Sequence, residues 1–183
     1  MLFCLHMTLL DSRSEKAFAG KDVYFSNSMQ GVLNQEKDFG WNIIQYLLEN
    51  GANVLDQHVG GRDQGERDRL FFVDNGFELD RGDRPWVAVE QADVKLVDKA
   101  SHVIAFVDGA SHGVGSEIQR AIDLYEFEID KKEILCLIRE DYLKGLSWMI
   151  RGKASPKYPN FHLETYKDLE DVKVKIFNFL TMH

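Results

Sequence analysis

Short apolar runs alternate along this chain with longer segments in which apolar residues recur at helical spacing. The run at 134–138 is apolar throughout, as expected for a strand buried on both faces. Such alternation predicts a parallel sheet covered by helices. We therefore expect an α/β fold with a doubly wound, five-stranded parallel sheet and helices on both faces, of the Rossmann-like or flavodoxin-like kind. The expected strands are 22–26, 53–55, 102–107, 134–138 and 162–166, and the expected helices are 41–48, 87–99, 116–125, 143–151 and 169–180.

Composition and charge narrow the class of protein. The chain has 183 residues, of which 44% are hydrophobic and 28% charged, enough for one hydrophobic core. Its net charge of −8 argues against a nucleic-acid partner or an acidic membrane surface, because both need clustered Lys and Arg. We expect a single domain over 21–183, interrupted at about 60–85 by an insert rich in charge and glycine that we interpret as a loop or lid.

The first 20 residues are expected to precede this domain as a leader. Residues 1–10 are apolar, but this stretch is short and no basic segment precedes it. We interpret 1–20 as poorly ordered or loosely docked, with a secretory signal peptide as the alternative. Cys4 and Cys136 form neither a CxxC pair nor a disulfide framework, so we expect a reducing compartment, the cytoplasm or alternatively the nucleus.

The segment from Ser111 to Arg120 places a carboxylate where an expected strand passes into an expected helix. Gly113 and Gly115 would let the backbone turn sharply and approach a ligand, because open α/β sheets bind ligands at the carboxyl ends of strands. Glu117 would then lie in the first helical turn, where free amides and the helix dipole keep a carboxylate ionised and available as a nucleophile. The alternative is an ordinary acidic residue that only stabilises the helix.

Five pieces of the sequence together resemble one known family. They are Tyr24-Phe25-Ser26-Asn27-Ser28, Leu55-Asp56-Gln57-His58-Val59, Gln91-Ala92-Asp93, Ser111 through Glu117, and Leu146-Ser147-Trp148-Met149-Ile150-Arg151-Gly152. Their order and context are similar to those of the 2'-deoxynucleoside 5'-phosphate N-hydrolases, within the wider nucleoside 2-deoxyribosyltransferase family. The resemblance covers the chain from Val23 onward, except the charged insert.

The resemblance implies a catalytic set of three residues. Glu117 matches the family residue that attacks C1' of the sugar to form a covalent glycosyl-enzyme intermediate, which water then resolves. Asp93 matches the acid that protonates or steers the leaving base, a role that needs a pKa raised by burial or by the charge of Glu117. Tyr24 matches a tyrosine beside the nucleophile and the sugar. Without the resemblance, Asp93 would be interpreted as a solvated helix residue and Tyr24 as a buried aromatic.

The resemblance also implies a substrate, a 2'-deoxynucleoside 5'-monophosphate, and a homodimer. Ser111 stands where nucleoside-using transferases have an aspartate, and a hydroxyl can donate to a 5'-phosphate that a carboxylate would repel. Ser147 would reach the phosphate from the neighbouring subunit. Neither a cofactor nor a metal is implied, since the His, Cys and acidic residues show no ligand spacing. The remaining expected substrate-binding residues are Asn27, Ser28, Gln30 and Gly31 in the turn after the first strand, His58 near the base, and Gly113 and Gly115.

Two departures from the family pattern leave alternatives open. Gln30 stands where the hydrolases usually have an arginine, and Asn27 where a glycine is usual. Losing a guanidinium weakens phosphate binding, although five arginines of the insert could replace its charge. The alternatives are a nucleoside 2-deoxyribosyltransferase that moves deoxyribose between bases and a catalytically silent nucleotide-binding module. The five arginines are Arg62, Arg67, Arg69, Arg81 and Arg84.

Overall fold

The computed structural model describes residues 16–28, 38–76 and 85–183, and these ranges contain a parallel sheet of five strands. The strands lie in the order β2-β1-β3-β4-β5, and each neighbouring pair is parallel. This is a flavodoxin-like order, so the predicted fold is confirmed. The strands are β1 (Asp22–Ser26), β2 (Asn53–Val54), β3 (His102–Phe106), β4 (Glu133–Arg139) and β5 (Phe161–Tyr166).

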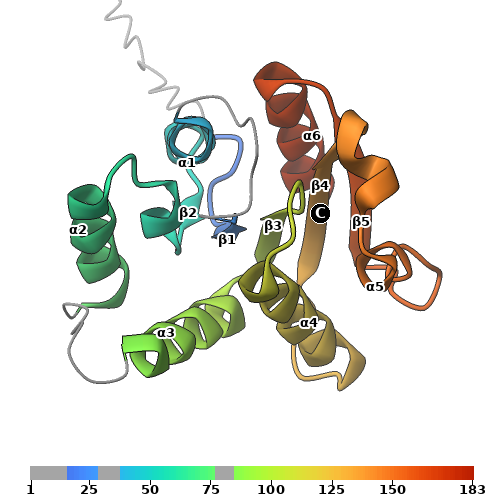
Figure 1. Ribbon diagram of the computed structural model, residues 1–183, viewed down its shortest axis with the longest axis horizontal. Helices are drawn as coiled ribbons and strands as arrows, with labels where there is room; N and C mark the ends of the chain where they lie inside the picture. The colour runs from blue at the N-terminus through green and yellow to red at the C-terminus, as the bar shows by residue number, and fades with distance from the viewer. Residues whose placement is uncertain (1–15, 29–37, 77–84) are drawn as a thin grey trace, which may run out of the picture.

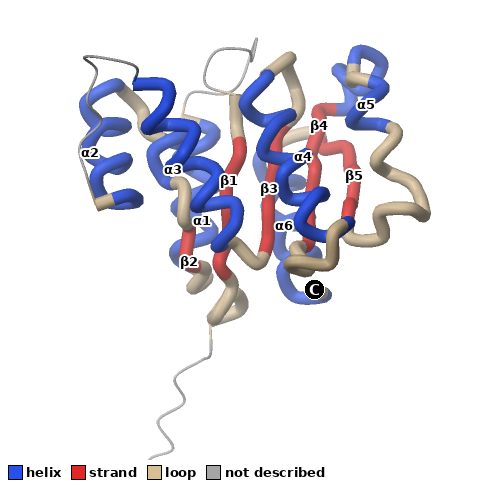
Figure 2. The backbone as a smooth tube through the Cα atoms, turned by 90° about the horizontal axis from the view of Figure 1, so that it is seen from below, coloured by secondary structure: helices blue, strands red, loops and turns tan. Residues whose placement is uncertain are grey.

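Two layers of helices cover the sheet. Helices α1 (Phe39–Glu49) and α6 (Leu169–Met182) lie on one face, and α3 (Pro85–Lys99) and α4 (His112–Glu126) lie on the other (Figures 1 and 2). Successive strand residues supply the two faces in turn: Phe25 and Ile104 belong to the apolar cluster under α1 and α6, whereas Tyr24 belongs to the cluster under α3 and α4. The central strand β3 is buried at every residue, which explains why all of its residues after His102 are apolar.

The domain begins before residue 21, so the expected boundary of the leader is wrong. Phe18 is fully buried in the cluster under α1 and α6. Its amide donates to the carbonyl of Asn50 at 2.9 Å, and its ring lies 5.8 Å from that of Tyr46. Residues 16–20 therefore belong to the packed domain, while 1–15 lie outside the described residues.

The charged insert contains a helix that the sequence analysis interpreted as loop or lid. Helix α2 (Gln64–Asn75) is capped by Asp63, whose side chain accepts from the amide of Glu66, and it ends at Gly76 with φ at +76°. Leu70 and Phe71 are buried, and the helix packs against the short 3₁₀ helix η1 (Gln57–Gly60) (Figure 1). The loop interpretation is therefore wrong for 64–75. The sequence does not indicate this helix, because only two of its apolar residues face the domain and its helical periodicity is weak.

A second correction concerns the segment expected to form one helix at 143–151. It forms a 3₁₀ helix, η2 (Glu140–Gly145), and a short helix α5 (Trp148–Arg151), with Leu146 and Ser147 between them. Ser147 begins α5 by accepting from the amide of Met149 at 3.3 Å. The break places Ser147 in an extended conformation at the carboxyl end of the sheet.

Among the described residues, no helix is long and apolar enough to cross a membrane.

Replacing Phe18 by alanine tests whether the first described turn is part of the core. We expect Phe18→Ala to lower the free energy of unfolding by about 3 to 5 kcal/mol, because it removes a fully buried ring and leaves a cavity. Urea unfolding followed by circular dichroism measures the change. Phe127→Ala is the matched control, since this ring is 71% exposed and its loss should change stability by no more than about 0.5 kcal/mol. Equal effects of the two substitutions would contradict the assignment.

Candidate active site

Strand β1, helix α3 and the first turns of helix α4 bring the predicted catalytic residues together. Helix α4 begins at His112, and Ser111 caps it by accepting from the amide of Val114 at 3.4 Å. The helix therefore starts four residues earlier than expected. Glu117 lies in its second turn, and the expectation that it occupies the first turn is wrong.

Glu117 is held by the end of β1. The hydroxyl of Ser26, the last residue of that strand, donates to Oε2 of Glu117 in a short hydrogen bond. Burial raises the pKa of Glu117, and the hydrogen bond from Ser26 opposes this shift. The residue lies beyond the first turn and is largely desolvated, so the helix terminus does not offset the effect of burial on its pKa.

The two glycines of the motif are helical and do not form the sharp turn that was expected. A methyl group built at Gly113 would lie 3.8 Å from Oε1 of Glu117 and 3.9 Å from Oγ of Ser111. One built at Gly115 would meet no atom within 4 Å. Because Gly113 and Gly115 have no side chains, space is left beside Glu117 and Ser111, and a ligand can approach the backbone closely.

Tyr24 and Asp93 face the same buried region. Tyr24 is fully buried on β1, and burial followed by the charges of Asp56 and Glu117 raises its pKa well above the ordinary value. Asp93 projects from α3, where burial raises its pKa to about 7 and the charges of Asp56 and Glu117 add to the shift. The expected elevation of the Asp93 pKa agrees with this electrostatic environment.

His58 binds two carboxylates that the sequence analysis did not select. Its Nδ1 lies 2.7 Å from Oδ1 of Asp56 and 3.4 Å from Oδ2 of Asp74, and its amide donates to Asp74 at 3.1 Å. Burial alone lowers the pKa of His58, but Asp56 and then Asp74 outweigh burial and raise it. Asp56 could have been found as the polar residue directly after the second expected strand. Asp74 could not, because it comes from α2, which was not predicted.

The candidate phosphate-binding residues are less completely described. Asn27 and Ser28 follow β1, whereas Gln30 and Gly31 lie outside the described residues. Ser111 and Ser147 both line a cavity of about 650 Å³. The same cavity is lined by Lys153, a buried cation missed by the sequence analysis, whose Nζ donates to Oε1 of Gln119.

Two arginines of the insert are already occupied by contacts near their own helix. Arg62 pairs with Glu66 at 2.8 Å and lies over the ring of Trp41, and Nε of Arg67 donates to the carbonyl of Gly61 at 2.9 Å. Arg81 and Arg84 lie outside the described residues.

In the described part of the chain, two groups of three side chains have donor atoms close enough to share a metal ion. One is Asp56, His58 and Asp74; the other is Glu133, His162 and His183. The first offers a single imidazole nitrogen that already pairs with both carboxylates, so we interpret it as a buried ion-paired group of the site. The second lies at the other end of the sheet.

Comparison with known proteins agrees with this geometry. No model of a known protein family matches the sequence. A 5-hydroxymethyl-dUMP N-hydrolase from Danio rerio is 35% identical over 162 residues, covering 87% of this chain and 98% of the relative. Proteins named as candidate 2'-deoxynucleoside 5'-phosphate N-hydrolases from Nematostella vectensis and Trichoplax adhaerens are 30% and 34% identical over 88% and 90% of this chain, covering 95% and 96% of those relatives.

A solved structure supports the fold. The CMP N-glycosidase BcmB of Clostridium botulinum superposes with a TM-score of 0.55 at 22% identity, covering 84% of this chain and 95% of that one. With the relatives above, this similarity extends over nearly all of the described domain. The chain belongs to the 2'-deoxynucleoside 5'-phosphate N-hydrolase family.

Proposed function

We propose that this protein hydrolyses the N-glycosidic bond of 2'-deoxynucleoside 5'-monophosphates and releases the free base and 2-deoxyribose 5-phosphate. Its relatives are named for this class of reaction. The observation that carries the proposal is the meeting of Glu117, hydrogen-bonded to Ser26, with Asp93 and Tyr24 in one partly desolvated region.

In this proposal Glu117 and Asp93 divide the chemistry. The ionised carboxylate of Glu117 attacks C1' as the bond from C1' to the base nitrogen breaks, and the carboxyl of Asp93 gives its proton to the departing base. Asp93, now ionised, then takes a proton from a water molecule that attacks C1' and releases Glu117. The pKa of Asp93, raised to about 7, suits a group that must give and take a proton near neutral pH.

Tyr24 and His58 complete the proposed sugar and base subsites. Because the pKa of Tyr24 is raised, its hydroxyl stays protonated and can donate a hydrogen bond beside Glu117. The imidazole of His58, fixed by Asp56 and Asp74, is charged at neutral pH and offers a donor near the base. Tyr24 is anchored by strand β1, and His58 by the 3₁₀ helix η1.

Phosphate recognition is proposed to use hydroxyls, backbone amides and one lysine. Asn27 and Ser28 form one side, and Ser111 with the open face at Gly113 and Gly115 forms the other. Gln30 and Gly31, which lie outside the described residues, stay candidates from the sequence alone. Lys153 lines the same cavity as Ser111 and Ser147. Its positive charge offsets the guanidinium that is absent at Gln30.

We further propose a homodimer in which Ser147 reaches the site of the neighbouring subunit. The two residues that follow it, Trp148 and Met149, are 87% and 75% exposed. Exposed apolar side chains this large are typical of a surface that another chain covers. Met149 also lines the cavity of Ser111 and Ser147, so a second copy seated there would place this cavity at the interface. Ser147 of one copy would then reach the phosphate site of the other.

Replacing the nucleophile tests the proposed reaction. Glu117→Gln should lower kcat on 5-hydroxymethyl-dUMP by on the order of 10³-fold or more while leaving nucleotide binding nearly unchanged, because the amide keeps the shape but cannot form the glycosyl ester. Base release followed by chromatography measures kcat, and calorimetry measures binding. Glu126→Gln is the matched control on the same helix, since Glu126 pairs with Lys157 at the surface.

The same assay separates hydrolysis from sugar transfer. With the unmodified protein, added acceptor base should leave the rate of base release unchanged and yield no new nucleotide. Faster turnover with acceptor, or a preference for nucleosides over nucleotides, would identify a transferase instead. Nucleotide binding without base release by either the parent or the Glu117→Gln protein would indicate a silent binding module.

The pH dependence of kcat/KM tests Asp93. The acid must be protonated, so kcat/KM should fall about tenfold per pH unit above the Asp93 pKa of about 7. At the other end it should fall as Glu117 becomes protonated, at a pH higher than for an ordinary glutamate because the pKa of Glu117 is raised. Asp93→Asn should reduce turnover by about 10² to 10⁴-fold and remove the alkaline limb.

Asp98→Asn is the control for this profile, because Asp98 lies on the same helix but pairs with Arg120 at the surface. It should keep the alkaline limb. An Asp93→Asn profile with the limb still present would assign that limb to another group, such as the substrate phosphate, and would refute the proposed acid.

Mixing an impaired variant with an inactive one tests the shared site. Ser147→Ala should lower kcat/KM by about 10 to 100-fold through weaker phosphate binding, and Glu117→Gln is inactive. After subunit exchange, a mixed dimer contains one site with both Glu117 and Ser147, so an equal mixture should regain about a quarter of the parent activity. If Ser147 served the site of its own chain, mixing would restore nothing. Light scattering confirms the dimer.

A further inference from the structure

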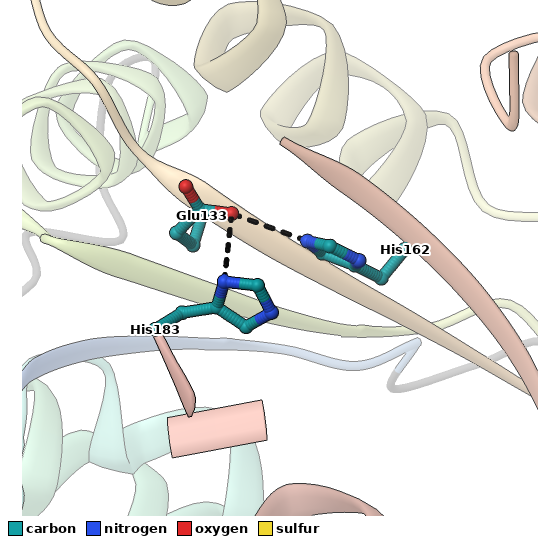
Figure 3. A group of neighbouring side chains, drawn as sticks. All are labelled: Glu133, His162 and His183. Atoms are coloured by element: carbon teal, nitrogen blue, oxygen red, sulfur yellow. Dashed lines mark hydrogen bonds and ion pairs between the residues drawn. The ribbon is translucent and has the colours of Figure 1, made fainter. Parts of the chain in front are cut away.

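Three side chains of types that can ligate a metal converge at the end of the sheet opposite to the proposed catalytic residues. Glu133 is the first residue of β4, His162 is the second residue of β5, and His183 follows the end of α6. Figure 3 shows the three side chains turned toward one another. We propose that Glu133, His162 and His183 form a binding site for a divalent transition-metal ion, and that zinc is the ion it binds.

The separations of the donor atoms fit such an ion. Oε2 of Glu133 lies 3.1 Å from Nε2 of His162 and 3.8 Å from Nδ1 of His183, and all the donor atoms lie within 4.8 Å of one another. Tetrahedral zinc with bonds of about 2.0 to 2.1 Å needs its ligand atoms roughly 3.3 Å apart. Shifts of well under 2 Å would therefore place all three donors around one ion.

The fold holds these donors in place without the ion. In the register of β4 and β5, Leu135 pairs with His162, so Glu133 begins the neighbouring strand beside it. Helix α6 returns along the sheet and brings His183 back to this end (Figure 2). The rings of His162 and His183 lie 4.6 Å apart, and each also contacts the ring of Phe179. Preorganised ligands lose little freedom when the ion binds.

The chemistry of the donors favours zinc over calcium or magnesium. Two imidazole nitrogens and one carboxylate oxygen are borderline ligands that suit zinc, nickel and copper, whereas calcium and magnesium prefer oxygen alone. The side chains of Glu133, His162 and His183 are 30%, 28% and 33% exposed. This exposure gives the ion a path of entry and leaves a fourth position for water.

A bound ion would fasten the end of α6 to the first residues of β4 and β5. Because only the folded chain brings the three donors together, the metal binds the folded state and stabilises it by mass action. The site shares no residue with the proposed catalytic set, so the two proposals can fail independently.

The test is zinc titration of the full chain by calorimetry in a non-chelating buffer, together with thermal unfolding with and without zinc. The parent protein should bind one zinc ion per chain at micromolar or lower concentration, and zinc should raise its Tm. His183→Gln and His162→Gln should each weaken binding at least about tenfold and abolish the zinc-dependent rise in Tm. Cobalt should give the visible bands of a tetrahedral ion with the parent and lose them in both variants.

Two controls separate this site from the other histidines. His112→Gln removes an exposed histidine of α4, and Asp74→Asn removes a carboxylate from the group around His58; both should bind zinc like the parent. His183 lies at the exposed end of α6, so His183→Gln should keep the Tm of the parent when zinc is absent. Parent-like zinc binding by the His162 and His183 variants, or no saturable binding by the parent, would overturn the proposal and leave Glu133 with a simple ion pair.

Discussion

The burial of several carboxylates in one small region is the constraint on which the site depends. Asp56, Asp93 and Glu117 act on one another electrostatically beside the buried ring of Tyr24. Three desolvated negative charges repel one another, so the region is stable only when some are paired or protonated. Asp56 pairs with His58, and Glu117 accepts from Ser26. Asp93 has neither kind of partner among these groups, and it is the carboxyl whose pKa is raised to about 7. The separation of the proposed acid from the proposed nucleophile thus follows from which carboxylates have partners.

The parallel sheet is what makes this arrangement available. Every strand runs in one direction, so side chains that end different strands meet at one edge although they are distant in sequence. Ser26 and Glu117 are separated by 91 residues and are nevertheless hydrogen-bonded. The opposite edge gathers residues by the same rule, which brings Glu133 beside His162. Each edge therefore collects polar side chains around a shared apolar interior.

The sequence predicts the sheet well because burial on both faces leaves a simple pattern. The central strands β3 and β4 appear as apolar runs, whereas β5 mixes polar and apolar residues and gives a weaker signal. Glu117, Asp93 and Tyr24 were selected through the family resemblance. Helix α2 was missed because most of its face is solvated, and with it the contribution of Asp74. The first turn of α4 was missed because its glycines suggest a turn, whereas the cap at Ser111 decides where the helix begins. The group of Glu133, His162 and His183 could not be predicted, because these residues are far apart in the sequence and form no recognisable motif. Strand register and the return of α6 bring them together.

The burial of these carboxylates also lowers the free energy of unfolding near the pH at which the site is proposed to work. The pKa of Asp93 is raised in the folded state, so the unfolded chain releases this proton first, and stability falls as the pH rises from about 4 to about 7. Stability falls with rising pH in the range of His58 too, but there the quantity lost is a favourable contribution. Its raised pKa means that its pairing contributes fully below its unfolded pKa of about 6.5 and is lost only as the pH rises through its folded pKa. At neutral pH the charged His58 therefore offsets part of the cost of Asp93. Helix α2 supplies Asp74 to this pairing, so the insert supports the charge balance of the site from outside the catalytic set.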